Sequence, residues 1–118
     1  MAPSEIVKIW VKAFNSGDVG RLESLYTDDA INHQMPNTAI KGKSAIKEMF
    51  SKEFKLAPEM NCIPVQIIEE GNWAVLEWKD PKGFRGCGFF EIINGKIKTQ
   101  RGYWDRLSFM KIYGEQVY

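Results

Sequence analysis

The hydrophobic period of this chain changes once, near Met60, and that change limits the folds that it can adopt. Before Met60, apolar residues such as Ile6, Trp10 and Phe14 recur at helical spacing. After Met60, runs rich in Ile, Val and aromatic residues are separated by turn signals, of which Asn94-Gly95 is the strongest. Helices first and strands afterwards predict an α+β domain, not alternating βαβ units.

Three helices and five strands are predicted. Ser4 is expected to cap the first helix, which ends at 15–18, a short second helix ends at 27–29, and the third lies between Gly42 and Pro58. Glycines in or beside the later strands indicate bulges and strong curvature. The expected fold is a short first strand plus a four-stranded antiparallel meander, forming a curved, cone-shaped sheet on three N-terminal helices. The predicted strands are 30–35, 61–70, 73–79, 84–93 and 96–105, and 106–113 is expected to form a short helical turn.

Length, charge and cysteine content exclude several classes of protein. The 118 residues suit one domain, residues 1–118, and a net charge of +1 gives no electrostatic case for binding nucleic acid or an anionic membrane. No apolar run is long enough to span a bilayer, and the first residues lack the pattern of a signal peptide. With Cys62 and Cys87 as the two cysteines, a cytoplasmic protein with free thiols is expected.

Five short motifs carry a family resemblance. Residues 14–18, 25–30, 42–46, 95–97 and 101–105, in this order, resemble the SnoaL-like branch of the nuclear transport factor 2 (NTF2)-like superfamily. That branch is similar to polyketide cyclases, limonene epoxide hydrolases and ketosteroid isomerases. The resemblance covers nearly the whole chain and implies a conical fold with an internal small-molecule pocket. Because the fold hosts many reactions, function has to be argued from the site.

Asp105 is the first candidate catalytic residue. If Ile97 faces the core, alternation puts Arg101, Tyr103 and Asp105 on the same face, provided that Gly102 forms no bulge. A carboxylate in an apolar pocket has a raised pKa and can exchange protons near neutral pH. The resemblance implies the same role for an acidic residue at this place. The alternative is a structural carboxylate that fixes Arg101 or the next turn.

The first strand offers two alternative sets of site residues. Alternation directs His33 away from Asn32 and Gln34, so one set faces the pocket. His33 could transfer a proton, whereas Asn32 and Gln34 could orient water or a carbonyl oxygen. Epoxide hydrolases carry a Tyr and an Asn where Asn32 and Gln34 stand, and the missing Tyr argues against epoxide hydrolysis here.

The strand at 73–79 has an acid and a base on one face. Glu77 and Lys79 share that face, and Leu76 and Trp78 share the other. Glu77 and Lys79 could form an ion pair that lines the pocket, or a solvated stripe on the outer face. In the first case Trp78 and Trp104 lie on the outer face of the sheet, where they predict a homodimer interface. Family resemblance implies dimerisation through the same face.

These residues lead to one functional hypothesis and two alternatives. The leading hypothesis is an acid/base enzyme without a cofactor, acting on a mainly apolar small molecule by isomerisation, cyclisation, dehydration or hydrolysis. No clustered His, Cys or carboxylates indicate a metal site. The alternatives are a non-catalytic ligand-binding module and a dimerisation domain of the same fold. Other residues expected at the pocket are Tyr26 and Tyr103 as hydroxyl donors and Trp10 and Phe50 as walls.

Overall fold

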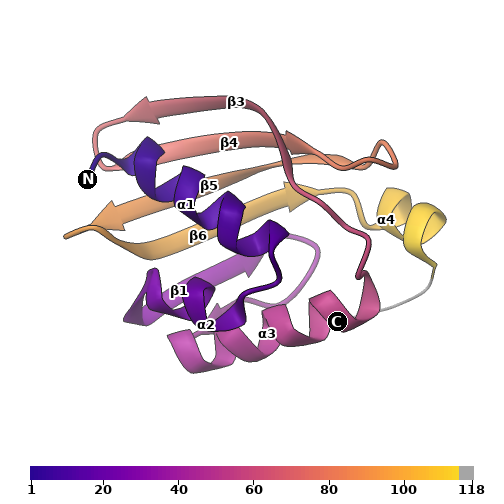
Figure 1. The fold of residues 1–118 in the computed structure, drawn as a ribbon, viewed down its shortest axis with the longest axis horizontal. Coiled ribbons are helices and arrows are strands. Elements are labelled where there is room, and N and C mark those ends of the chain that lie inside the picture. The colour runs from indigo at the N-terminus through magenta and orange to yellow at the C-terminus, as the bar shows by residue number, and fades with distance from the viewer. Residues whose placement is uncertain (115–118) are drawn as a thin grey trace.

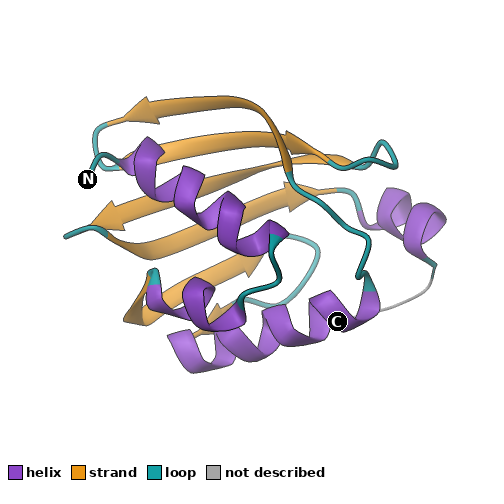
Figure 2. Ribbon diagram, viewed as in Figure 1, coloured by secondary structure: helices purple, strands orange, loops and turns teal. Residues whose placement is uncertain are grey.

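A mixed sheet of six strands forms one layer of the described chain, and α1, α2 and α3 lie on the same face of it (Figure 1). The structure is a computed structural model that describes residues 1–114. Figure 2 shows the fourth helix at one end of the sheet. The predicted α+β fold is confirmed. Its elements are α1 (Pro3–Asn15), α2 (Val19–Ser24), β1 (Tyr26–Gln34), β2 (Ile40–Lys41), α3 (Lys43–Leu56), β3 (Ile63–Glu70), β4 (Trp73–Lys79), β5 (Arg85–Ile93), β6 (Lys96–Trp104) and α4 (Arg106–Tyr113).

The strands follow the spatial order β2-β1-β6-β5-β4-β3. The meander from β3 to β6 is antiparallel throughout, as predicted, and β1 joins its β6 edge in parallel. β1 is longer than the predicted strand at 30–35, and its first half pairs irregularly with β6 between Tyr26 and Ile31. β2 was not predicted, because two residues are too short to show a period.

The helices differ from the prediction mainly at their ends. α1 begins at Pro3 with Ala2 as its N-cap, so the prediction that Ser4 caps it is wrong. Proline suits the first turn because it lacks an N–H group that would need a partner there. The Glu5 carboxylate accepts the Ala2 N–H at 3.0 Å and satisfies the helix start. None of the helices in residues 1–114 is long and apolar enough to cross a membrane.

One extra residue in β6 decides which side chains face the helices. Thr99 pairs with Glu91, but Ile97 pairs with Ile92, so Lys98 has no partner on β5. This bulge reverses the alternation, because each residue in a strand points to the face opposite its neighbour's. Ile97 is buried in the core, yet beyond the bulge Gln100 and Gly102 are buried and Tyr103 is exposed.

A second, smaller hydrophobic cluster fixes α4 to the end of the sheet. Phe109 and Tyr113 of α4 pack with Phe84 and Ala57. Beneath them, Asp80 is buried and accepts hydrogen bonds from the backbone N–H groups of the turn that follows it, and from the Tyr113 hydroxyl. Asp80 therefore adds a buried polar contact to the hydrophobic contacts that hold α4 in place.

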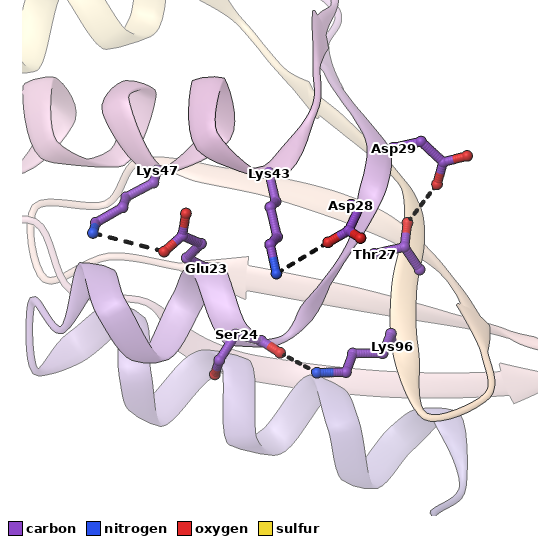
Figure 3. Close-up of polar contacts among 8 residues, drawn as sticks. All are labelled: Glu23, Ser24, Thr27, Asp28, Asp29, Lys43, Lys47 and Lys96. Atoms are coloured by element: carbon purple, nitrogen blue, oxygen red, sulfur yellow. Dashed lines mark hydrogen bonds and ion pairs between the residues drawn. The ribbon is translucent and has the colours of Figure 1, made fainter.

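Ion pairs on the outside connect α3 to α2 and β1 (Figure 3). Lys43 Nζ lies 3.1 Å from the Asp28 carboxylate, and Lys47 Nζ lies 3.6 Å from that of Glu23. Lys96 Nζ donates to the Ser24 carbonyl at 2.7 Å. These contacts involve exposed or half-exposed side chains, so each contributes little to stability.

Candidate functional site

A cavity of about 730 Å³ lies between the helices and the inner face of the sheet. This volume falls in the range of small-molecule sites. Its walls come from α1, α3, α4 and the connections β1–β2 and α3–β3 on one side, and from β1, β4, β5 and β6 on the other. Residues 10, 14, 50 and 90 form an aromatic group in which Trp10 stacks on Phe14 at 5.1 Å and meets Phe90 edge-on at 5.3 Å.

A second aromatic group surrounds the α4 end of the cavity. The Phe84 ring lies 5.3 Å from Trp78, 5.9 Å from Trp104 and 5.5 Å from Phe109, measured between ring centroids. All four of these side chains line the cavity. The parts of the cavity wall formed by these two groups are therefore mainly aromatic, which favours a planar or otherwise apolar ligand.

Three amide side chains from neighbouring strands cross the inner face of the sheet. Trp104 Nε1 donates to Gln34 Oε1 at 2.8 Å, Gln34 Nε2 donates to Asn32 Oδ1 at 2.7 Å, and Asn32 Nδ2 donates to Gln100 Oε1 at 3.1 Å. Gly102 permits this arrangement, since a Cβ atom there would lie 1.8 Å from Gln34 Oε1. We call Gln34, Asn32 and Gln100 the amide chain.

The opposite end of the amide chain is fixed by a buried tyrosine. Trp10 Nε1 donates to Tyr26 Oη at 3.0 Å, and the Tyr26 hydroxyl donates to Gln100 Oε1. Burial raises the pKa of Tyr26, so its hydroxyl keeps its proton. Tyr26 is nearly inaccessible behind the cavity wall and does not line the cavity.

The two indole groups set the direction of every hydrogen bond in this network. An indole N–H can only donate, so the bonds run inward from Trp10 and from Trp104. The two series of hydrogen bonds meet at Gln100 Oε1, which accepts from both Tyr26 and Asn32. The N–H₂ group of Gln100 is therefore still available as a donor. Gln100 is 4% exposed and lines the cavity, and no acceptor in residues 1–114 bonds its N–H₂ group. A buried donor of this kind requires an acceptor from water or a ligand.

Glu53 of α3 is the acidic residue of the cavity wall. Its side chain is half-buried, and within the described residues its carboxyl makes no hydrogen bond or ion pair. Burial raises the pKa of Glu53 to about 7. A carboxyl with this pKa can both take and give a proton at neutral pH.

Glu53 was not among the site residues expected from the sequence, although it lines the cavity. Glu53 stands three residues after Phe50 and seven after Ile46, both of which are buried. This spacing repeats on one face of a helix. The signal was therefore present in the sequence, but a charged residue is expected outside by default.

Arg106 brings a positive charge to the cavity from the first position of α4. Its Nη2 donates to the Pro36 carbonyl and to Asn37 Oδ1. Both acceptors are neutral, and no carboxylate forms an ion pair with Arg106 in the part of the chain that the structure describes.

The structure shows which of the two alternative sets of site residues on the first strand faces the cavity. Asn32 and Gln34 line the cavity, together with Trp10 and Phe50 as expected. His33 lies half-buried on the opposite face of β1, beside Arg101 of β6.

The prediction that Asp105 faces the pocket is wrong. Asp105 follows the end of β6, is exposed, and caps α4 by accepting the Ser108 N–H at 2.9 Å and the Ser108 hydroxyl at 2.7 Å. These hydrogen bonds lower the pKa of Asp105, which is the opposite of the expected rise. The Lys98 bulge had already broken the alternation on which the prediction rested.

The expected faces of β4 and of the end of β6 are also reversed. Glu77 and Lys79 do not line the cavity; Glu77 lies 3.7 Å from Arg85 in an exposed ion pair, and Lys79 is exposed. Tyr103 is 41% exposed on the outer face and is not a cavity residue. Trp78 and Trp104, placed outside by the same argument, line the cavity.

Among the described residues, no group of three or more His, Cys, Asp or Glu side chains is placed to hold a metal ion. Cys62 lines the cavity, but burial raises its pKa to about 12, so the thiol stays protonated. Its backbone N–H and carbonyl bond the Asn15 side chain at 2.7 and 2.9 Å.

Comparison with known protein families shows to which family this chain belongs. The model of the SnoaL-like domain matches residues 7–100. The chain belongs to the SnoaL-like domain family. No curated protein matches this SnoaL-like chain in sequence.

Solved structures share the fold of this SnoaL-like domain at low sequence identity. An NTF2-like protein from Cytophaga hutchinsonii has a TM-score of 0.80 and 14% identity, with 93% of this chain and 96% of that chain covered. An LEH-like epoxide hydrolase of M. tuberculosis has a TM-score of 0.76 and 19% identity, covering 92% and 86%. The epoxide hydrolase/cyclase-like enzyme SalBIII has a TM-score of 0.78 and 19% identity, covering 89% and 92%. The fold therefore includes small-molecule enzymes.

Proposed function

We propose that this SnoaL-like protein is an acid/base enzyme without a cofactor, in which Glu53 carries the proton and the cavity holds a mainly apolar organic substrate. The observation that carries the proposal is a carboxyl on an aromatic cavity wall with no ion-pair or hydrogen-bond partner in residues 1–114. Titratable groups held in this way occur most often at functional sites.

The amide chain supplies the second requirement of such chemistry. When Glu53 takes a proton from a substrate carbon, the C–H electron pair has to move onto another atom, and an adjacent carbonyl oxygen is the usual acceptor. The Gln100 N–H₂ group is buried at the cavity wall and has no protein acceptor in the described chain, so it suits such an oxygen. Returning the proton from Glu53 to a different substrate atom completes an isomerisation. Attack of the carbanion on a second carbonyl forms a C–C bond and an alkoxide, and return of the proton from Glu53 to the alkoxide oxygen completes a cyclisation.

Epoxide hydrolysis of the limonene epoxide hydrolase type is not part of this proposal. The resemblance implies an Arg and an Asp two residues apart on the strand that corresponds to β4. The cavity-lining residues of β4 are Leu76 and Trp78, neither of which is charged. The sequence places Asn32 where those enzymes have a Tyr, which agrees with this exclusion.

The proposal is tested by proton exchange, for which model ketones can stand in for the natural substrate. A panel of aryl ketones is incubated with the protein in D₂O, and deuterium uptake beside the carbonyl is followed by NMR. We expect Glu53→Gln to slow the exchange by at least about 100-fold, because general acid–base catalysis contributes about that much. With Glu53 as the base, the rate rises as the pH increases through about 7.

Glu48→Gln is the matched control, since Glu48 lies on the same helix and is exposed. It should keep the wild-type exchange rate. Exchange by the wild type no faster than the uncatalysed background, with a ligand still bound, would instead support the non-catalytic binding module. Catalysed exchange at equal rates in the wild type and Glu53→Gln would show that Glu53 is not the base.

A further inference from the structure

Arg106 is the cationic side chain of the cavity wall, and its surroundings are unusual for a charge. The residue is half-buried and lines the cavity together with Trp104 and Phe109, which belong to the aromatic group at the α4 end. A charge beside apolar walls is unfavourable unless an opposite charge or several hydrogen bonds compensate it.

The protein compensates only one nitrogen of the guanidinium group. Nη2 donates to the Pro36 carbonyl and to Asn37 Oδ1, which uses two of the five N–H groups of arginine. The N–H groups on Nη1 and Nε have no acceptor in residues 1–114. Since both acceptors are neutral oxygens, the positive charge itself is not paired within this part of the chain.

The two bonds to Nη2 also hold the guanidinium plane in place. The N–H groups on Nη1 and Nε are then held in a constant orientation, and each can donate a charge-assisted hydrogen bond to one oxygen of an anion. Binding to a group that is already ordered costs less conformational entropy than binding to a mobile side chain.

From this geometry we infer that the α4 end of the cavity is a subsite for an aromatic carboxylate, with Arg106 as the residue that pairs with the carboxylate group. Phe84, Trp104 and Phe109 then contact the aromatic part of the ligand. The inference rests on the proposed function in that it defines the substrate class of the same cavity. It makes the substrate an organic anion, whereas the general proposal requires only an apolar molecule with a carbonyl group.

A purely structural Arg106 is the competing interpretation. In that case its role is to hold residues 36 and 37 against the start of α4, and the charge faces water in the cavity. The two interpretations differ in whether a ligand's charge affects its affinity. A pair of probes with the same shape and different charge therefore separates them.

The probes are 2-naphthoate and its neutral counterpart 2-naphthamide. Their binding to the full chain is measured by quenching of tryptophan fluorescence, since three tryptophans line the cavity. We expect 2-naphthoate to bind at least ten-fold more tightly than 2-naphthamide, with an affinity that falls as salt is added. Arg106→Gln should reduce this preference to less than two-fold.

Arg85→Gln is the matched control, because Arg85 is exposed and belongs to the ion pair with Glu77 outside the cavity. It should keep the preference for 2-naphthoate. Equal affinities for the two probes in the wild type, no binding of 2-naphthoate, or a preference that survives in Arg106→Gln would each overturn the inference. If Arg106→Gln does not fold, Arg106→Met replaces it, and it should likewise reduce the preference to less than two-fold, because methionine is also unbranched but carries no charge.

Failure of this inference can be distinguished from failure of the proposed function. Glu53→Gln should abolish ketone exchange and leave the preference for 2-naphthoate intact. If exchange depends on Glu53 but the protein shows no preference for the anion, the proposed function holds and the carboxylate subsite is rejected. A preference for the anion without exchange would keep the carboxylate subsite and remove catalysis.

Discussion

Glu53 shows how one residue can link the chemistry of the cavity to the stability of the fold. Its pKa is raised from 4.5 to about 7 because burial disfavours the charged form. Between these two values the unfolded chain has lost the proton and the folded chain still holds it. The folded state therefore binds more protons in this pH window, and stability falls as the pH rises through it.

The first prediction is that Glu53→Gln removes this pH dependence. From pH 4.5 to 7, the wild type should lose up to about 3 kcal/mol of unfolding free energy relative to the variant, which corresponds to the difference between the two pKa values. Urea denaturation at pH 5 and at pH 8 measures the effect. Parallel curves for the two proteins would show that Glu53 is solvated and that its pKa is near the ordinary value.

Gly102 is the residue on which the amide chain depends most directly. In Gly102→Ala the new Cβ atom would lie 1.8 Å from Gln34 Oε1, so Gln34 has to move away from Trp104. We expect a loss of about 1–3 kcal/mol in unfolding free energy, from donors and acceptors that lose their partners. Thermal or urea unfolding checks this value.

Gly20→Ala serves as the comparison for Gly102→Ala. Gly20 lies within α2, and the nearest atom to a Cβ there is 3.7 Å away, an ordinary contact. Alanine in a helix is favoured over glycine by about 0.5–1 kcal/mol, so this variant should be slightly more stable than the wild type. A similar loss in both variants would argue against the steric explanation.

At this scale the sequence predicted part of the site. Asn32 and Gln34 were one of two alternatives, and Trp10 and Phe50 were expected as walls. Asp105 and Tyr103 could not be placed correctly, because their orientation depends on a bulge that pairing with β5 creates. No hydrophobic pattern in the sequence could predict that Arg106 lines the cavity, because its position depends on the residue at which α4 begins.

At the scale of elements, α4 is joined to the turn after β4 by a buried polar contact. Its Tyr113 hydroxyl bonds Asp80 Oδ2, while Asp80 Oδ1 accepts the N–H groups of Lys82 and Phe84 at 3.0 and 2.9 Å. Without Tyr113, one oxygen of a carboxylate in a residue that is 3% exposed loses its protein donor.

Tyr113→Phe should therefore destabilise the protein by about 1–3 kcal/mol, the usual cost of a buried polar atom left without its partner. Because α4 carries Arg106 and Phe109, the variant should also bind 2-naphthoate more weakly. Tyr103→Phe is the matched control, since that ring is 41% exposed on the outer face and should tolerate the change. Equal stabilities of the two variants in urea would contradict the role assigned to Asp80.

The elements themselves followed well from the sequence. The periods before and after Met60, and turn signals such as Asn94-Gly95, predicted the helices and the meander. Alternation within a strand could not reveal the Lys98 bulge, because a bulge is a property of two paired strands. β2 escaped prediction for a simpler reason, which is that two residues show no pattern.

At the scale of the whole molecule, the predicted homodimer remains a prediction, but its contact residues change. Ile68, Val75 and Phe89 form a cross-strand row on the outer face, and Tyr103 packs against Phe89 at 5.6 Å. Arg101 covers part of this face by lying 4.6 Å from the centroid of Trp73. An outer face of this composition suits a partly apolar interface.

Sedimentation velocity tests the prediction. The wild type should sediment as a dimer, and Phe89→Glu should shift it to a monomer with unchanged helix content. Val65→Glu is the control, since Val65 is already 45% exposed on the edge strand β3. A wild-type monomer across the accessible concentrations would remove the homodimer.

The bulge at Lys98 has a consequence for how a chain of this kind changes over time. Deleting that one residue would let β6 pair with β5 in regular alternation, while Thr99 and every later side chain would keep their present partners and faces. Where the pairing is regular, loss of one residue instead moves each side chain beyond it to the opposite face of the sheet. The bulge is therefore a place where β6 can change its length by one residue and leave Gln100 and Gly102 facing the cavity. Single-codon deletions at this place are compatible with the site, whereas those elsewhere in the strand would change its chemistry.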